Sequence, residues 1–122
     1  MRASILKLGN VLIASVQGSM TDADLAQMRD ELVADVRRYR STGVIVDVTL
    51  LDVMDSFAAR TLRGIAHMIK LLGATAVIVG IQPEVAFSMV QLGLTLEGIN
   101  TALDLEEGLA LLKVPGIGAH DR

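Results

Sequence analysis

The chain has 122 residues, 52% of them hydrophobic, and its 11 basic and 14 acidic side chains give a net charge of −3. This length is enough for one domain to bury a core without disulfides or a metal. Cysteine is absent, which excludes a disulfide framework, a thiol nucleophile and a zinc thiolate site. The basic residues do not alternate with the few aromatic ones, so nucleic acid is not expected as a partner.

Neither secretion nor membrane insertion is expected. The N-terminus lacks the sustained apolar region and the cleavage-like site of a signal peptide. No apolar run free of charges reaches the ~20 residues that span a bilayer. We therefore expect a cytoplasmic protein whose partners are other proteins.

The N-terminal part predicts a hairpin followed by a helix. Ser4 to Leu8 and Val11 to Val16 flank Gly9-Asn10, a dipeptide that favours a tight reversal. Thr21, with Asp24 three residues later, resembles a capping box that opens a helix. Apolar residues then recur at spacings of three and four, which predicts one buried helix face made of Leu25, Met28, Leu32, Val36 and Tyr39.

The centre of the chain predicts two buried strands, each followed by a helix. Val44 to Val48 and Ala74 to Val79 are continuous apolar runs, typical of strands covered on both faces. Helical patterns follow from Ser56 to Leu72 and from Pro83 to about Gly93. This alternation indicates right-handed crossovers between parallel strands.

A short strand near Ile99 to Leu103 and a helix from Leu105 to about Lys113 complete the pattern. We therefore predict one α/β domain over residues 1–122, with a core over 4–113 and a flexible tail over 114–122. Its sheet is mixed and mostly parallel, with four to five strands, an N-terminal hairpin and about four helices.

The helix that starts at Ser56 divides into three faces at ~100° per residue. One is apolar and should face the sheet: Ala58, Leu62, Ile65, Ala66, Ile69 and Leu72. A second is basic: Arg60, Arg63, His67 and Lys70. Between them lies a stripe of small residues bracketed by larger apolar ones: Phe57, Thr61, Gly64 and Met68. The basic face is either a solvated surface or a docking surface for acidic groups, to which Phe57 and Met68 add apolar contact.

Ser56 itself stands where a strand and its loop lead into a helix. Backbone N–H groups lack partners there and the helix dipole favours negative charge, so the serine is either a cap or a place for a phosphate. A phosphate would add about −1.5 to −2 charge beside Asp52 and Asp55 and would repel an acidic partner surface. The two roles are compatible, and together they describe a release switch.

Catalysis by this chain is less well supported. Asp47, Asp52 and Asp55 surround the end of the central strand and could hold magnesium or accept a phosphoryl group. The acids and the lysine that a receiver-type phosphoacceptor would need elsewhere are missing. Of the two histidines, His67 belongs to the basic face and His120 to the tail, so neither suits a base for Ser56. We expect no enzyme activity, no cofactor and no metal.

Several segments together resemble the STAS-domain family. They are Asp55-Ser56-Phe57 at the start of a helix, the loop Gly80-Ile81-Gln82-Pro83, Leu92-Gly93, and the stretch from Ala102 to Gly108 that reads ALDLEEG. More narrowly, the loop and the ALDLEEG stretch resemble RsbS-type scaffold subunits of the bacterial stressosome. The resemblance covers Ile5 to about Lys113.

The resemblance implies a regulatory scaffold that assembles with RsbR-type paralogues and sequesters an RsbT-type serine kinase. Ser56 matches the serine that this kinase phosphorylates, and an RsbX-type phosphatase would reset the system. Ser88 aligns with a second phosphorylated position of the RsbR type and is the weaker candidate. Asp55 and Phe57 would shape the kinase-facing site, with Arg60, Arg63, Met68 and Lys70 as further partner-binding residues.

The alternative is a standalone anti-sigma factor antagonist that binds an anti-sigma kinase directly. Antagonists of that kind usually continue the Asp-Ser pair with a small residue and glycine, whereas Phe57-Ala58-Ala59 follows here. This departure favours the stressosome type. The resemblance is to the minimal subunit and not to the sensing paralogue.

Overall fold

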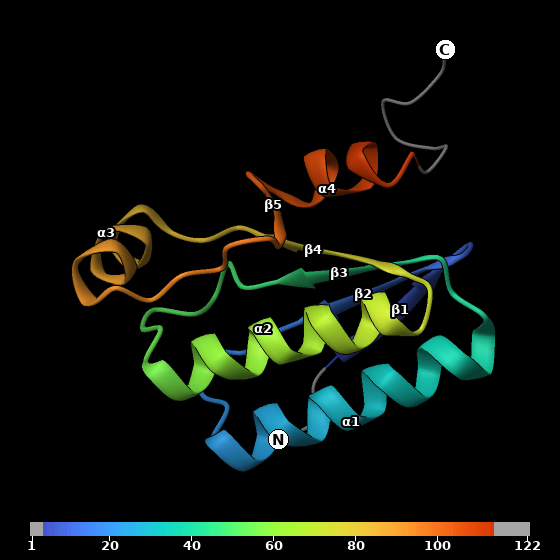
Figure 1. Cartoon of the computed structure of the whole chain (residues 1–122), viewed down its shortest axis with the longest axis horizontal. Coiled ribbons are helices and arrows are strands. Elements are labelled where there is room, and N and C mark those ends of the chain that lie inside the picture. The colour runs from blue at the N-terminus through green and yellow to red at the C-terminus, as the bar shows by residue number, and fades with distance from the viewer. Residues whose placement is uncertain (1–3, 114–122) are drawn as a thin grey trace.

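The computed structural model describes residues 4–113, which form one five-stranded sheet and four helices (Figure 1). The strands are β1 Ser4–Leu8, β2 Val11–Ser15, β3 Gly43–Asp47, β4 Thr75–Val79 and β5 Asn100–Ala102. The helices are α1 Asp22–Tyr39, α2 Ser56–Leu71, α3 Pro83–Leu92 and α4 Leu105–Leu111. The tail predicted for residues 114–122 lies outside the described residues.

The sheet follows chain order, β1-β2-β3-β4-β5. The β1–β2 pair is antiparallel and the other three pairs are parallel. The predicted mixed sheet with an N-terminal hairpin is therefore confirmed, and each predicted element is present within a few residues of its expected bounds. None of the helices within residues 4–113 has the length and apolar character needed to cross a bilayer.

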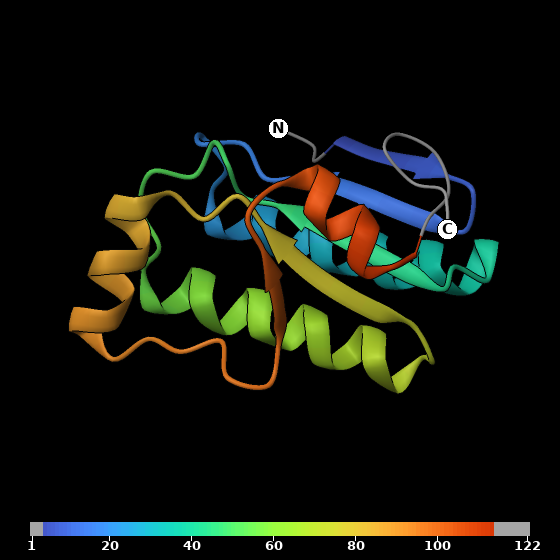
Figure 2. The same ribbon diagram turned by 90° about the horizontal axis from the view of Figure 1, so that it is seen from above.

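Helices cover both faces of the sheet (Figure 1). α1 and α2 lie side by side on one face, and α4 lies on the other. Seen from above, α3 lies beyond the ends of the strands and not over the sheet (Figure 2). The loop that leads into α2 runs at this same end, because parallel strands place their carboxyl ends at one edge of the sheet (Figure 1).

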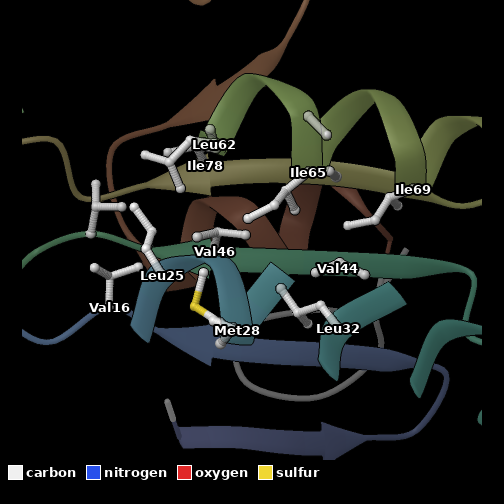
Figure 3. Close-up of a cluster of buried hydrophobic side chains, with 14 of the residues drawn as sticks. Val16, Leu25, Met28, Leu32, Val44, Val46, Leu62, Ile65, Ile69 and Ile78 are labelled. Carbon is white, nitrogen blue, oxygen red and sulfur yellow. The ribbon is translucent and has the colours of Figure 1, made fainter. Parts of the chain in front are cut away.

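The core is built by strand alternation. Val44 and Val46 of β3 point toward α1 and α2, whereas Ile45 lies in the cluster under α4. In Figure 3 the labelled side chains of the larger cluster interdigitate between the two helices and the sheet. Gly108 lets α4 approach closely, since a Cβ there would lie 2.8 Å from Val79 Cγ1.

The predicted capping box at the start of α1 is confirmed. The Asp24 N–H donates to Thr21 Oγ1 (3.1 Å) and the Thr21 N–H donates to Asp24 Oδ2 (3.0 Å). The hydrogen bond from the Thr21 backbone favours the charged carboxylate and lowers the pKa of Asp24. The capping box therefore satisfies two backbone N–H groups at the start of α1.

Two residues expected on buried helix faces are exposed. Tyr39, the last residue of α1, is 41% exposed, and its ring lies 5.6 Å from Lys7 Nζ and 5.5 Å from the Arg38 guanidinium carbon. Leu72 is 40% exposed because it is the C-cap of α2 and not part of its last turn. Both predictions were wrong for the same reason: the helical periodicity was extended to the end of the helix, where the chain leaves the helix and turns into the next strand, β3 after Tyr39 and β4 after Leu72.

Candidate phosphorylation site

Ser56 is the first residue of α2, but it is not the N-cap. Asp55 takes that position: its Oδ1 accepts from the Ala58 N–H at 2.8 Å, and its backbone oxygen accepts from the Ala59 N–H at 3.0 Å. The prediction that Ser56 caps the helix was therefore wrong. Ser56 is exposed, and within residues 4–113 no hydrogen bond to its hydroxyl is found. Its oxygen is thus available to another molecule.

The N-terminus of α2 can accommodate a charged group on Ser56. The N–H groups of Ser56 and Phe57 precede the first intrahelical donor, and among the described residues neither has a backbone partner. The dipole of a helix with 16 residues adds partial positive charge at the same place. A phosphate attached here would be tolerated by the helix that carries it.

The loop between β3 and Ser56 is held by several short contacts. The N–H and hydroxyl of Thr49 both donate to Asp47 Oδ1, at 2.9 and 2.5 Å. The Leu51 N–H donates to the Val48 carbonyl oxygen at 3.0 Å. Met54 is buried in the core directly before the helix. Ser56 is therefore presented by an ordered segment that is fixed at both ends.

The predicted partner-binding residues on α2 have different surroundings. Arg60, Met68 and Lys70 are exposed, as a docking surface would need. Phe57 is half-buried and packs against the core. The Arg63 guanidinium Nη1 donates to the Thr95 carbonyl oxygen at 2.9 Å, so this side chain fastens the segment between α3 and β5 (Figures 1 and 2). Part of the predicted basic docking face is thus used within the chain itself.

The small-residue stripe is also partly covered. Ala66 and Lys70, on the opposite flank of α2, line a hollow together with residues of β4 and with Asn100 of β5. At ~100° per residue the stripe must then lie on the flank toward α1, which packs against α2. Thr61 is buried accordingly. We expected another surface to pack closely against this stripe. At Thr61 that surface is α1 of the same chain.

The three carboxylates at this end of the sheet do not converge. Asp47 accepts from Thr49, Asp55 caps α2, and Asp52 Oδ1 lies 3.4 Å from Gln82 Nε2. Within residues 4–113 no group of three or more acidic or histidine side chains is arranged to hold a metal ion. The alternative reading of Asp47, Asp52 and Asp55 as a joint metal site is therefore not supported.

A base for Ser56 is not provided by His67. This side chain is exposed on α2, eleven residues after Ser56, which at 1.5 Å per residue is about 16 Å along the helix axis. Ser88, the second phosphorylation candidate, is exposed on α3. Ser56 and Ser88 thus lie on different helices, and the start of α2 and the whole of α3 lie at the same end of the molecule (Figure 2).

Sequence reasoning missed the contact between the two loops at this end of the sheet. Gln82 Nε2 donates to the Thr49 carbonyl oxygen at 2.6 Å. A Cβ on Gly80 would overlap Thr49 Oγ1, so the backbone of this glycine lies directly against the Asp47–Thr49 turn. The Gly-Ile-Gln-Pro motif was noticed, but its partner in space was not.

The STAS domain family model matches residues 2–108 of this chain. Among solved structures, a serine-to-glutamate variant of RsbS from Moorella thermoacetica is 34% identical, with a TM-score of 0.80, over 93% of this chain and 96% of that one. A structure describing the molecular architecture of the stressosome is also 34% identical, with a TM-score of 0.78, over 90% of this chain and 96% of that one.

The RsbT co-antagonist protein RsbRA of Bacillus subtilis is 27% identical over 100 residues, which are 82% of this chain and 36% of that protein. RsbRC of the same organism is 33% identical over 73 residues, 60% of this chain and 26% of that protein. The chain therefore spans about a third or less of the length of these two relatives. Its likeness to the RsbS structure, by contrast, extends over nearly all of both chains. The chain belongs to the STAS domain family, and within that family it resembles RsbS over nearly its whole length.

Proposed function

We propose that this chain is a non-enzymatic scaffold of a stressosome-type assembly, which sequesters an RsbT-type serine kinase and releases it when Ser56 is phosphorylated. The observation that carries the proposal is the exposed hydroxyl of Ser56 at the start of α2, left available because Asp55 caps the helix. The likeness to RsbS and to a stressosome structure supports it.

The chemistry belongs to the kinase. The γ-phosphoryl group of ATP moves to Ser56 Oγ, so one O–P bond forms while the bond to the ADP leaving group breaks. The hydroxyl proton passes to a base of the kinase, because the His67 side chain is too far along α2 to receive it. An RsbX-type phosphatase then hydrolyses the phosphoserine and restores the sequestering form.

The kinase would contact the exposed part of α2 and the loop before it. Arg60 and Lys70 offer positive charge, Met68 offers apolar surface, and Asp55 with Phe57 frames the serine. Arg63 contributes indirectly by fixing the neighbouring segment through Thr95. We place this kinase contact in the cytoplasm.

Phosphorylation of Ser56 is the first test. Incubation with the RsbT-type kinase and ATP should add one phosphoryl group, which peptide mass spectrometry should locate on Ser56. The Ser56→Ala variant should take up none, and Ser88→Ala should take up as much as the wild type, because Ser88 is the weaker candidate. A phosphate found elsewhere in the wild type would overturn the assignment.

Assembly is the second test. Mixed with an RsbR-type paralogue, the chain should sediment in analytical ultracentrifugation as a particle many times larger than its own 13.0 kDa. The relatives of the RsbR type and the stressosome structure support such a hetero-oligomer. A standalone antagonist would stay a monomer or dimer in the same mixture, and that result would favour the direct anti-sigma alternative.

A further inference from the structure

Two loops meet at the carboxyl ends of β3 and β4. One leads from β3 into α2 and carries Ser56 at its end, and the other leads from β4 into α3 (Figures 1 and 2). Gln82 of the second loop reaches the first. Its Nε2 donates to the Thr49 carbonyl oxygen at 2.6 Å and lies 3.4 Å from Asp52 Oδ1.

Gln82 stands where a residue normally caps its own helix. It is the N-cap of α3, yet its side chain makes no capping hydrogen bond. Pro83 at the first helical position has no N–H, so one donor of that helix end is already absent. The side chain is instead committed to the neighbouring loop.

Thr49 is thereby held from two sides. Its N–H and hydroxyl donate to Asp47 Oδ1, while its carbonyl oxygen accepts from Gln82. The Gln82 side chain thus comes from outside this loop and reaches it at both Thr49 and Asp52. Within residues 4–113, loss of the Gln82 amide would leave Thr49 with its two hydrogen bonds to Asp47.

We propose that Gln82 is a positioning residue for the phosphorylation of Ser56: it holds the loop before α2 in the conformation that the kinase recognises. This inference rests on the proposed function of Ser56. A kinase needs the acceptor oxygen in a narrow range of positions, and a misplacement of about 1 Å can slow such a reaction by up to ~100-fold. Gln82 acts through the loop and does not touch the transferred group.

The test compares Gln82→Met, which keeps the length and removes the donor, with the wild type. Gln91→Met, an exposed change on the same helix, is the matched control. With the RsbT-type kinase, Gln82→Met should lower kcat for Ser56 by about tenfold and leave KM within about threefold, as expected when orientation and not docking is lost. Gln82→Lys, which restores a donor toward Thr49 and Asp52, should recover part of kcat.

Hydrogen exchange on the chain alone gives a second readout. The amides of Thr49 and Leu51, which donate to Asp47 and Val48, should exchange faster in Gln82→Met and not in Gln91→Met. An unchanged kcat in Gln82→Met would overturn the proposal and leave the Ser56 assignment intact. Absence of any phosphate on Ser56 in the wild type would instead overturn the proposed function and, with it, this inference.

Discussion

Ser56→Asp is expected to weaken binding of the RsbT-type kinase by at least about tenfold, which corresponds to ~1.4 kcal/mol. The substitution places a permanent negative charge at an exposed position, next to Asp55 and four residues after Asp52. Like charges facing an acidic partner surface repel it. Ser56→Ala, which adds no charge, should bind the kinase as well as the wild type. Titration calorimetry or a pull-down with purified components would measure both.

Ser56→Asp should not destabilise α2. A carboxylate in the first turn of a helix interacts favourably with its dipole, by roughly 0.3–1 kcal/mol. Ser56→Asp should therefore unfold at the same denaturant concentration as the wild type or slightly above it. Weakened binding then reports on the interface and not on misfolding.

Ser4→Asp provides the matched charge control. Ser4 is also exposed, but it lies on the edge strand β1, two strands away from β3, whose following loop carries Ser56. Ser4→Asp adds the same charge as Ser56→Asp, so a general electrostatic effect would weaken kinase binding in both variants. Equal binding by Ser56→Asp and Ser56→Ala would contradict the release switch.

The fold could be predicted from the sequence because its signals are local. The Gly9-Asn10 reversal and continuous apolar runs located the strands, and spacings of three and four located the buried face of α1. Thr21 and Asp24 fixed the start of that helix by side-chain chemistry alone. Each of these signals depends on residues within one turn or one strand of each other.

The cap of α2 shows where local signals fail. Asp55 and Ser56 are both good N-cap residues, and their order in the sequence does not say which one adopts the extended backbone of the cap. In the structure Asp55 does, and Ser56 moves into the first helical position. A displacement of one residue thus converts the serine from a helix stabiliser to an exposed hydroxyl.

The remaining features depend on distant contacts. Arg63 and Thr95 are 32 residues apart in the chain, and Gln82 and Thr49 are 33 apart. Such pairs form only once the fold has brought distant segments together; for Gln82 and Thr49 this requires the ends of β3 and β4 to lie side by side. Periodicity could mark Arg63 as exposed and Gln82 as a loop residue, but it could not name the carbonyl oxygen that each one reaches.

Gly80→Ala is expected to lower the free energy of unfolding by about 3 kcal/mol, the sum of ~1–2 for a left-handed backbone and ~1–3 for a forced contact. Gly80 has a φ of +82°. An added Cβ would overlap Thr49 Oγ1 and lie 3.1 Å from Asp47 Oδ1, so the turn that begins the Ser56 loop would have to shift. Urea denaturation followed by circular dichroism would measure the loss.

Gly73→Ala separates the two causes. Gly73 also has a positive φ, +93°, but an added Cβ there would meet no atom within 4 Å. Gly73→Ala should therefore lower the free energy of unfolding only through its left-handed backbone, by about 1–2 kcal/mol. The excess loss in Gly80→Ala then measures how tightly the end of β4 packs against the Asp47–Thr49 turn. If both variants lost the same free energy of unfolding, the Asp47–Thr49 turn would be able to shift without cost. Such a turn could not hold the loop in place for the kinase.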